Sequence, residues 1–349
     1  MSELIDEIPT RDEFIESYNS KSSKDQAKNS LAHLDLWLDK KGITELEFFE
    51  QMNQSNSTIR ARVLNEQSQF MLKNRRRDRV NLVRLSPKTV ILLRNHLLRW
   101  YEENNITIPQ TKIRRLAKLG PDFTELKHTP TALDINNLVK RQKNHDPATM
   151  FVLLSCTGMR INELRELRIG HIDLTNRTIN IPAHHTKTHT QRITFFTPEA
   201  RTWVKRHFDT RWSWDLWEKE PRMKIDKGFK RVRLTSRVSG DEFDHTEYMK
   251  LPLFEYSYNN YKWHFDQAMK DMGHTEKNHL GMKKMTIHRL RAFAKQQLAS
   301  AVNDDFAEII LGHVKGNKTY NVGSSDADIK RLRTEYDKAI PLLTLGTDP

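Results

Sequence analysis

The sequence predicts a mainly α-helical protein of two domains with one small antiparallel β-sheet. Three observations predict this class: helix-start signals recur along the first 105 residues, two short strand-like segments flank one polar turn further on, and helical patterns fill most of the remainder. At 349 residues the chain is long enough for about two domains, at roughly 100–200 residues per domain. Each domain can therefore bury its own core.

Residues 1–105 are predicted to form a small all-helical domain. Leu31, Leu34 and Leu38 share one helical face, and Gly42 follows them as a stop signal. A capping signal marks three helix starts in this domain: Thr10 with Glu13, Ser23 with Gln26, and Ser86 before Pro87.

Two clusters of cations predict a surface that contacts DNA phosphates, because their density exceeds what a solvated helix face needs. The helical pattern fades over 106–131, which predicts an interdomain linker with the second cluster in it. The first cluster, in the stretch 73–88, consists of Lys73, Arg75, Arg76, Arg77, Arg79, Arg84 and Lys88. The second consists of Lys112, Arg114, Arg115 and Lys118.

Residues 132–349 are predicted to form the second domain, mainly helical with a small sheet. An apolar helix opens at Asp146 and ends near Gly158, and another helix follows from about Arg160. Strands are expected at 178–182 and 192–197 as a β-hairpin around the turn HHTKTHT. Further helices are expected at 198–209, 257–272, 286–300, 303–311 and 326–342.

The composition favours a polyanionic partner. Lys and Arg number 58 against 45 Asp and Glu, a net charge of +13 at pH 7. A single cysteine, Cys156, excludes an internal disulfide framework and fits a reducing compartment. No apolar stretch approaches the roughly 18 residues of a membrane span, and the acidic start does not resemble a signal peptide. We therefore expect a cytoplasmic, nucleoid-associated protein without a membrane partner.

The second domain contains the groups that a phosphodiester transfer without metal requires: cations for the non-bridging oxygens, an acid for the leaving oxygen, and a nucleophile. Arginine suits the first task because its planar fork holds two phosphate oxygens at once. The candidates follow one another in the segments TGMRINEL, TKT, IHRLR and LGH and at one tyrosine beyond them: Arg160, Glu163, Lys187, His288, Arg291, His313 and Tyr320.

This ordered set resembles the tyrosine recombinases, also called the phage integrase family. The resemblance spans about 150–320 and implies a helical core-binding (SAM-like) domain followed by the catalytic domain of the family. It implies that Arg160 and Arg291 bind the scissile phosphate and that Lys187 protonates the leaving 5′ oxygen. Roles are also implied for the remaining residues: Tyr320 as the nucleophile that forms a 3′-phosphotyrosyl bond, His288 and His313 in proton transfer and phosphate binding, and Glu163 in orienting the cations.

The resemblance further implies a site-specific recombinase that integrates, excises or resolves DNA without metal, ATP or another cofactor. Its implied partner is a duplex DNA attachment site. Four copies would assemble on two such sites, and the free protein would be a monomer or weak oligomer. An accessory DNA-bending protein is a further possible partner. The spacing from His313 to Tyr320 is shorter than is common in the family, which leaves open whether Tyr320 acts in its own active site or in that of a neighbour.

Several alternatives stay open at this stage. A type IB topoisomerase would use a similar active site, and a catalytically silent DNA-binding protein would also be basic. Tyr336 is the rival nucleophile, although it lies on an apolar helical stripe. His184, His185 and His189 surround Lys187 but make a poor zinc site without a fixed carboxylate or thiolate. A tryptophan cluster in the basic stretch 205–255 fits packing better than base stacking: Trp212, Trp214 and Trp217.

Overall fold

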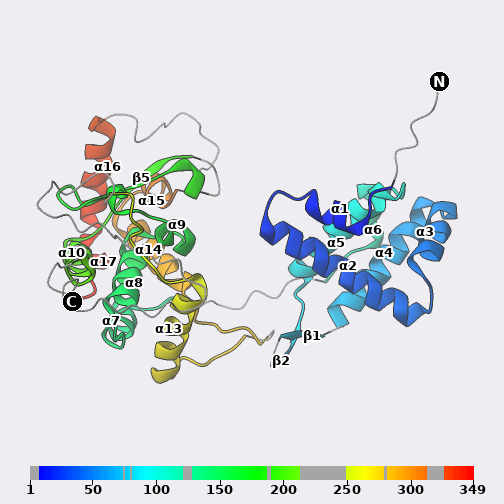
Figure 1. Ribbon diagram of the computed structural model, residues 1–349, viewed down its shortest axis with the longest axis horizontal. Coiled ribbons are helices and arrows are strands. Elements are labelled where there is room, and N and C mark those ends of the chain that lie inside the picture. The colour runs from blue at the N-terminus through cyan, green and yellow to red at the C-terminus, as the bar shows by residue number, and fades with distance from the viewer. Residues whose placement is uncertain are drawn as a thin grey trace, which may run out of the picture. The chain divides into compact units, whose positions relative to one another are not determined.

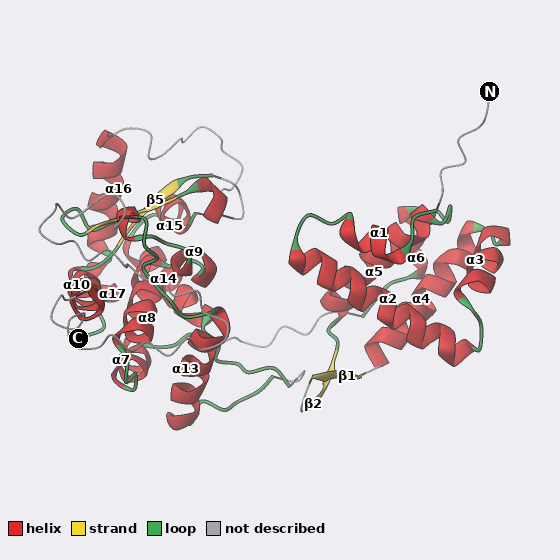
Figure 2. Cartoon of the chain, viewed as in Figure 1, coloured by secondary structure: helices red, strands yellow, loops and turns green. Residues whose placement is uncertain are grey.

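The computed structural model describes residues 8–73, 75–78, 81–120, 128–186, 190–212, 249–278, 281–312 and 326–349 (Figures 1 and 2). The chain divides into two compact units. One unit covers Met1–Leu126 with Lys277–Met282, and the other covers Lys127–Glu276 with Lys283–Pro349. Most of the described residues are helical, and a three-stranded antiparallel sheet lies in the second unit, so the predicted fold class is confirmed.

The first unit packs its helices around one apolar core. Its helices are α1 (Arg11–Glu16), α2 (Lys21–Lys41), α3 (Glu45–Gln54), α4 (Ser57–Lys73), α5 (Pro87–Glu103) and α6 (Gln110–Leu116). The predicted capping boxes and caps hold at Thr10 and at Ser86. The predicted start at Ser23 is wrong, because the Ser20 side chain accepts the Ser23 amide and α2 already begins at Lys21.

A two-stranded hairpin lies within the first basic cluster, so this unit is not all-helical as predicted. Strands β1 (Arg75–Asp78) and β2 (Asn81–Arg84) pair antiparallel, with Arg75 opposite Arg84 and Asp78 opposite Asn81. Strand pairing satisfies backbone groups whatever the side chains are. A run of cations without apolar alternation therefore carries no sequence signal for a strand.

The first part of the predicted linker 106–131 belongs to the first unit. Helix α6 packs on α4, and Ile106, Ile108 and Ile113 are buried in the core that α2, α4 and α5 share. The division between the units falls after Leu126. The three isoleucines are separated by polar and proline residues, which hides the short helix from a periodicity analysis.

Helix α8 (His145–Thr157) is the centre of the second unit, because every residue from 147 to 157 is buried. Helices α7, α10 and α14 pack around it. The surrounding helices are α7 (Ala132–Lys140), α9 (Ile161–Arg165), α10 (Pro198–Trp212), α13 (Tyr258–Asp271), α14 (His288–Ala301), α15 (Asp304–Leu311), α16 (Asp326–Lys338) and α17 (Ile340–Leu343). The predicted helix over 326–342 is thus two helices that meet at Ala339.

The three strands of the second unit lie in the order β3-β4-β5, and the predicted hairpin is formed by the last two. Their bounds are β3 (Ile172–Asp173), β4 (Thr178–Ile181) and β5 (Arg192–Phe195). Ile181 is paired with Arg192, and Thr178 with Phe195. Helices α15 and α16 pack against β5, so the sheet joins the hairpin to the C-terminal helices (Figure 1).

Two helices of the second unit, α8 and α15, end at a glycine. Gly158 has a φ of 62° and Gly312 has a φ of 70°. Residues with a Cβ atom rarely adopt such positive φ angles, whereas glycine does so readily. A Cβ atom on Gly158 would lie 2.3 Å from Cδ2 of Leu311, and one on Gly312 would lie 2.5 Å from Nε of Arg192. Both turns therefore require glycine for conformation and for space.

We predict that Gly158→Ala lowers the free energy of unfolding of the second unit by about 2–4 kcal/mol, because left-handed strain adds to overpacking. Gly273→Ala is the matched control, since Gly273 has a φ of 81° but no atom within 4 Å of its added Cβ. The control should cost only about 1–2 kcal/mol. Chemical denaturation of both variants measures the difference, and equal losses would contradict the packing argument.

Candidate active site

A glycine turn between α8 and α9 presents Arg160 and Glu163. The Glu163 side chain is only 2% exposed, and its Oε1 accepts a hydrogen bond from the Arg160 guanidinium at 2.7 Å. Its Oε2 accepts the Arg160 backbone N–H at 3.0 Å. Arg160 keeps a third of its side chain exposed and is therefore the accessible member of the pair.

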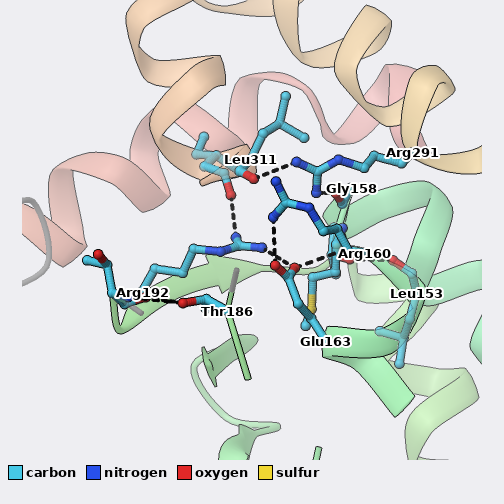
Figure 3. A network of polar contacts seen from close by, with 12 residues as sticks. Leu153, Gly158, Arg160, Glu163, Thr186, Arg192, Arg291 and Leu311 are labelled. Atoms are coloured by element: carbon cyan, nitrogen blue, oxygen red, sulfur yellow. Dashed lines mark hydrogen bonds and ion pairs between the residues drawn. The ribbon is translucent and has the colours of Figure 1, made fainter. Parts of the chain in front are cut away.

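Arg192, the first residue of β5, reaches the same carboxylate from the sheet. Its guanidinium donates to Oε2 of Glu163 at 2.8 Å and to the carbonyl oxygen of Ile310, near the end of α15, at 2.9 Å (Figure 3). The sequence analysis did not single out Arg192. The available signal was its position five residues after Lys187, on the strand that leaves the hairpin turn.

Arg291 on α14 completes a group of three arginines. Its guanidinium donates to the carbonyl oxygen of Gly158 and, at 2.9 Å, to that of Leu311 (Figure 3). The residue is buried, with 6% exposure. Both acceptors stand at helix C-termini, where the macrodipole favours a cation. Arg160, Arg192 and Arg291, which we call the arginine cluster, thus come from three different elements.

The Glu163 carboxylate is ionised, and Arg291 keeps its charge in spite of burial. Burial by itself would raise the pKa of the Glu163 carboxyl, but the Arg192 charge and the hydrogen bonds from Arg160 outweigh burial, so this pKa lies below its ordinary value of 4.5. Burial, followed by the charges of Arg160 and Arg192, lowers the pKa of Arg291 to about 10. Arg291 therefore stays protonated at neutral pH. Three cations against one carboxylate leave an excess of positive charge, which an anion would neutralise.

The other predicted catalytic residues lie at or beyond the edges of the described chain. His288 is exposed and begins α14, about one turn before Arg291. Lys187, His313 and Tyr320 lie outside the described residues, but two neighbours are placed. Gly312 directly precedes His313, and Thr186 directly precedes Lys187. The Thr186 hydroxyl exchanges hydrogen bonds of 3.0 Å with the backbone of Thr190, on the other side of the turn.

The predicted DNA-contacting cations are distributed over the first unit. Arg75, Arg76, Arg77 and Arg84 lie on the strands of the β1–β2 hairpin, and Arg79 lies outside the described residues. Lys112 donates to the Thr58 hydroxyl at 3.0 Å, so its ammonium already has a protein partner. Among the cluster residues whose side chains the structure describes, the exposed ones are Lys73, Lys88, Arg114, Arg115 and Lys118.

The structure makes Tyr336 a packing residue. Its ring is fully buried, its hydroxyl donates to the Cys156 carbonyl at 2.9 Å, and burial raises its pKa well above the ordinary value.

Among the described residues no group of three His, Cys, Asp or Glu side chains is placed to hold a metal ion. No helix in the described part of the chain is long and apolar enough to cross a membrane. Trp214 and Trp217 lie outside the described residues, as does the Trp212 side chain.

A model of the phage integrase family matches residues 130–322, which is more than half of the chain. The chain therefore belongs to the phage integrase family, whose members are the tyrosine recombinases. No curated protein sequence matches it.

Solved structures similar to this chain include three integrases. The integrase of mycobacterium phage Brujita is 12% identical, with 90% of this chain and 92% of that chain covered and a TM-score of 0.41. A Tn1549 transposon integrase in complex with a circular intermediate DNA is 16% identical, with 87% of this chain and 99% of that chain covered and a TM-score of 0.48. A lambda integrase tetramer bound to a Holliday junction is 14% identical, with 85% of this chain and 78% of that chain covered and a TM-score of 0.45. Because these TM-scores are below 0.5, the family assignment rests on the family match.

We predict that Glu163→Gln lowers the free energy of unfolding at pH 7 by about 2–3 kcal/mol, because the change leaves buried cations without their carboxylate. The folded-state pKa of Glu163 lies below 4.5. The ionised carboxylate therefore stabilises the fold fully above the unfolded pKa, and this contribution is lost as the pH falls through the folded pKa. The difference between wild type and variant should thus shrink below about pH 4.

Chemical denaturation at pH 7 and at pH 3.5–4 measures this effect. Glu335→Gln is the control, because Glu335 forms an exposed pair with Lys338 that should contribute at most about 1 kcal/mol. A Glu163→Gln loss no larger than that of Glu335→Gln, or a difference that is independent of pH, would show that the carboxylate does not organise the cluster.

Proposed function

We propose that this protein is a site-specific tyrosine recombinase that cuts and rejoins duplex DNA through a 3′-phosphotyrosyl intermediate at Tyr320. The observation that carries the proposal is the arginine cluster around Glu163. It gathers more positive charge than the single carboxylate balances, in a domain that belongs to the phage integrase family. The products would be integrated, excised or resolved DNA, and neither metal nor ATP would be consumed.

In the proposed reaction Arg160 and Arg291 bind the non-bridging oxygens of the scissile phosphate. Cations there stabilise the charge that develops on the phosphoryl group in the transition state. Arg160 suits contact with a ligand because a third of its side chain is exposed. Glu163 holds the Arg160 guanidinium in one orientation through the 2.7 Å ion pair, so less conformational freedom is lost when phosphate binds.

The covalent step exchanges one phosphoester bond for another. The Tyr320 oxygen attacks phosphorus as its phenolic proton leaves, with His288 or His313 assisting the transfer. The bond from phosphorus to the 5′ oxygen breaks, and Lys187 donates a proton to that oxygen. The phosphotyrosyl bond retains the energy of the ester. The 5′ hydroxyl of a partner strand can therefore attack the phosphotyrosyl phosphorus, which rejoins the DNA and releases Tyr320.

The partner would be a duplex attachment site. Four copies would assemble on two sites, and an accessory DNA-bending protein could take part. The exposed cations at Lys73, Lys88, Arg114, Arg115 and Lys118 fit phosphate contacts from the first unit.

We predict that the purified protein forms a covalent adduct with a nicked suicide duplex that contains its attachment site, without added metal or ATP. In such a duplex the short cleaved fragment diffuses away, so the phosphotyrosyl product accumulates. Tyr320→Phe should still bind the duplex and form no adduct on a denaturing gel, while Tyr336→Phe is the matched tyrosine control. Binding without an adduct in the wild type would favour a silent DNA-binding protein.

We also predict that the double variant Arg114→Ala, Arg115→Ala weakens DNA binding at all sequences alike. The dependence of the logarithm of the binding constant on the logarithm of salt concentration should become shallower by about one per arginine. Lys21→Ala, Lys28→Ala removes the same charge from exposed positions on α2 and should leave the slope nearly unchanged. Fluorescence anisotropy over a salt series measures both slopes. Equal slopes for the two double variants would remove the second basic cluster from the DNA interface.

A further inference from the structure

Arg192 is the member of the arginine cluster to which the proposed reaction gives no role. Its side chain is 11% exposed, so it is largely enclosed by protein. Its guanidinium binds two segments that come from distant parts of the chain. One partner is Glu163 in the glycine turn after α8, and the other is Ile310 in the last turn of α15.

Arg192 also fixes the residue that follows α15. A Cβ atom on Gly312 would lie 2.5 Å from Nε and 2.6 Å from Cδ of Arg192, so the backbone there passes directly over the arginine side chain. Next to it the carbonyl oxygens of Ile310 and Leu311 accept hydrogen bonds from Arg192 and Arg291 respectively. Two cations thus bind successive carbonyls at the negative end of one helix.

The carboxylate of Glu163 is shared in a specific way. Its Oε2 accepts both the Arg192 guanidinium and the Arg160 backbone N–H, and its Oε1 accepts the Arg160 guanidinium. Without Arg192 the carboxylate would lose one of the groups that fix its rotation, and Arg160 would lose its orientation with it. A single arginine on the hairpin strand therefore connects the Arg160 turn with the point from which the chain continues to His313 and Tyr320.

We propose that Arg192 is a positioning residue for strand cleavage. It acts through Glu163 on the orientation of Arg160, and through Ile310 and Gly312 on the start of the segment that holds His313 and Tyr320. The inference rests on the proposed function and adds a residue that the family resemblance in the sequence did not supply. In metal sites, groups that orient the ligands typically change activity by roughly 10–100-fold when removed, and we expect an effect of that order here.

The test compares Arg192→Gln with Arg177→Gln, a matched buried arginine of the same unit. Arg177 is 14% exposed and donates to the Phe196 carbonyl and the Asp337 carboxylate, but it contacts neither Glu163 nor α15. Single-turnover adduct formation is measured with saturating nicked duplex. Arg192→Gln should be slowed roughly 10–100-fold with unchanged DNA affinity, and Arg177→Gln less than about threefold.

A double variant separates positioning from general destabilisation. Arg192 acts partly through Glu163. The double variant Arg192→Gln, Glu163→Gln should therefore slow adduct formation by a much smaller factor than the product of the factors of the two single variants. If Arg192→Gln does not fold, Arg192→Lys takes its place, since lysine keeps the charge but cannot present two fixed donors. A wild-type rate for either Arg192 variant, or losses that multiply fully in the double variant, would overturn the proposal.

A second readout does not depend on catalysis. In folded Arg192→Gln, hydrogen exchange of the Arg160 amide should be roughly tenfold faster than in wild type, because its acceptor Oε2 is no longer held. An unchanged exchange rate would overturn the orienting role. If wild type forms no adduct, the proposed function fails and the role in cleavage fails with it. The amide exchange then still decides whether Arg192 orients Glu163.

Discussion

The rest of the site depends on the buried carboxylate of Glu163. A carboxylate with 2% exposure is stable only when cations and hydrogen-bond donors surround it, because desolvation of a charge costs several kcal/mol, on the order of what a whole ion pair returns. Arg160 and Arg192 supply these donors from two elements that are far apart in the sequence. Burying one anion therefore brings the glycine turn and the hairpin strand together, and it leaves Arg160 oriented and partly exposed.

The helix ends form the second part of this constraint. Arg291 and Arg192 bind carbonyl oxygens at the ends of α8 and α15, which places cations where the helix dipoles favour them. A Cβ atom on Gly312 would meet Arg192, and one on Gly158 would meet Leu311, so both helix ends require glycine. The cations are thus held in place by contacts within the fold itself.

The sequence singled out three residues that the structure then places in one cluster. Arg160, Glu163 and Arg291 could be singled out because a phosphate requires cations and because their order resembles the tyrosine recombinases, and the structure brings these three together. Arg192 could not be found in this way, since its partners are a carboxylate and a carbonyl that only the tertiary fold brings within reach. Short elements with weak periodicity, such as the β1–β2 hairpin and α6, were missed for a related reason: backbone pairing and a few buried isoleucines leave little pattern in the sequence.

The most direct test of this account is the identity of the residue that carries the DNA. The covalent product is digested with trypsin and nuclease, and the peptide with the attached nucleotide is identified by mass spectrometry. Cleavage after Lys318 and Lys330 gives a peptide in which Tyr320 is the one tyrosine, while Tyr336 falls in a different peptide. The account predicts the nucleotide on the peptide 319–330. A nucleotide on any other peptide, or none on a protein that binds the duplex, would contradict it.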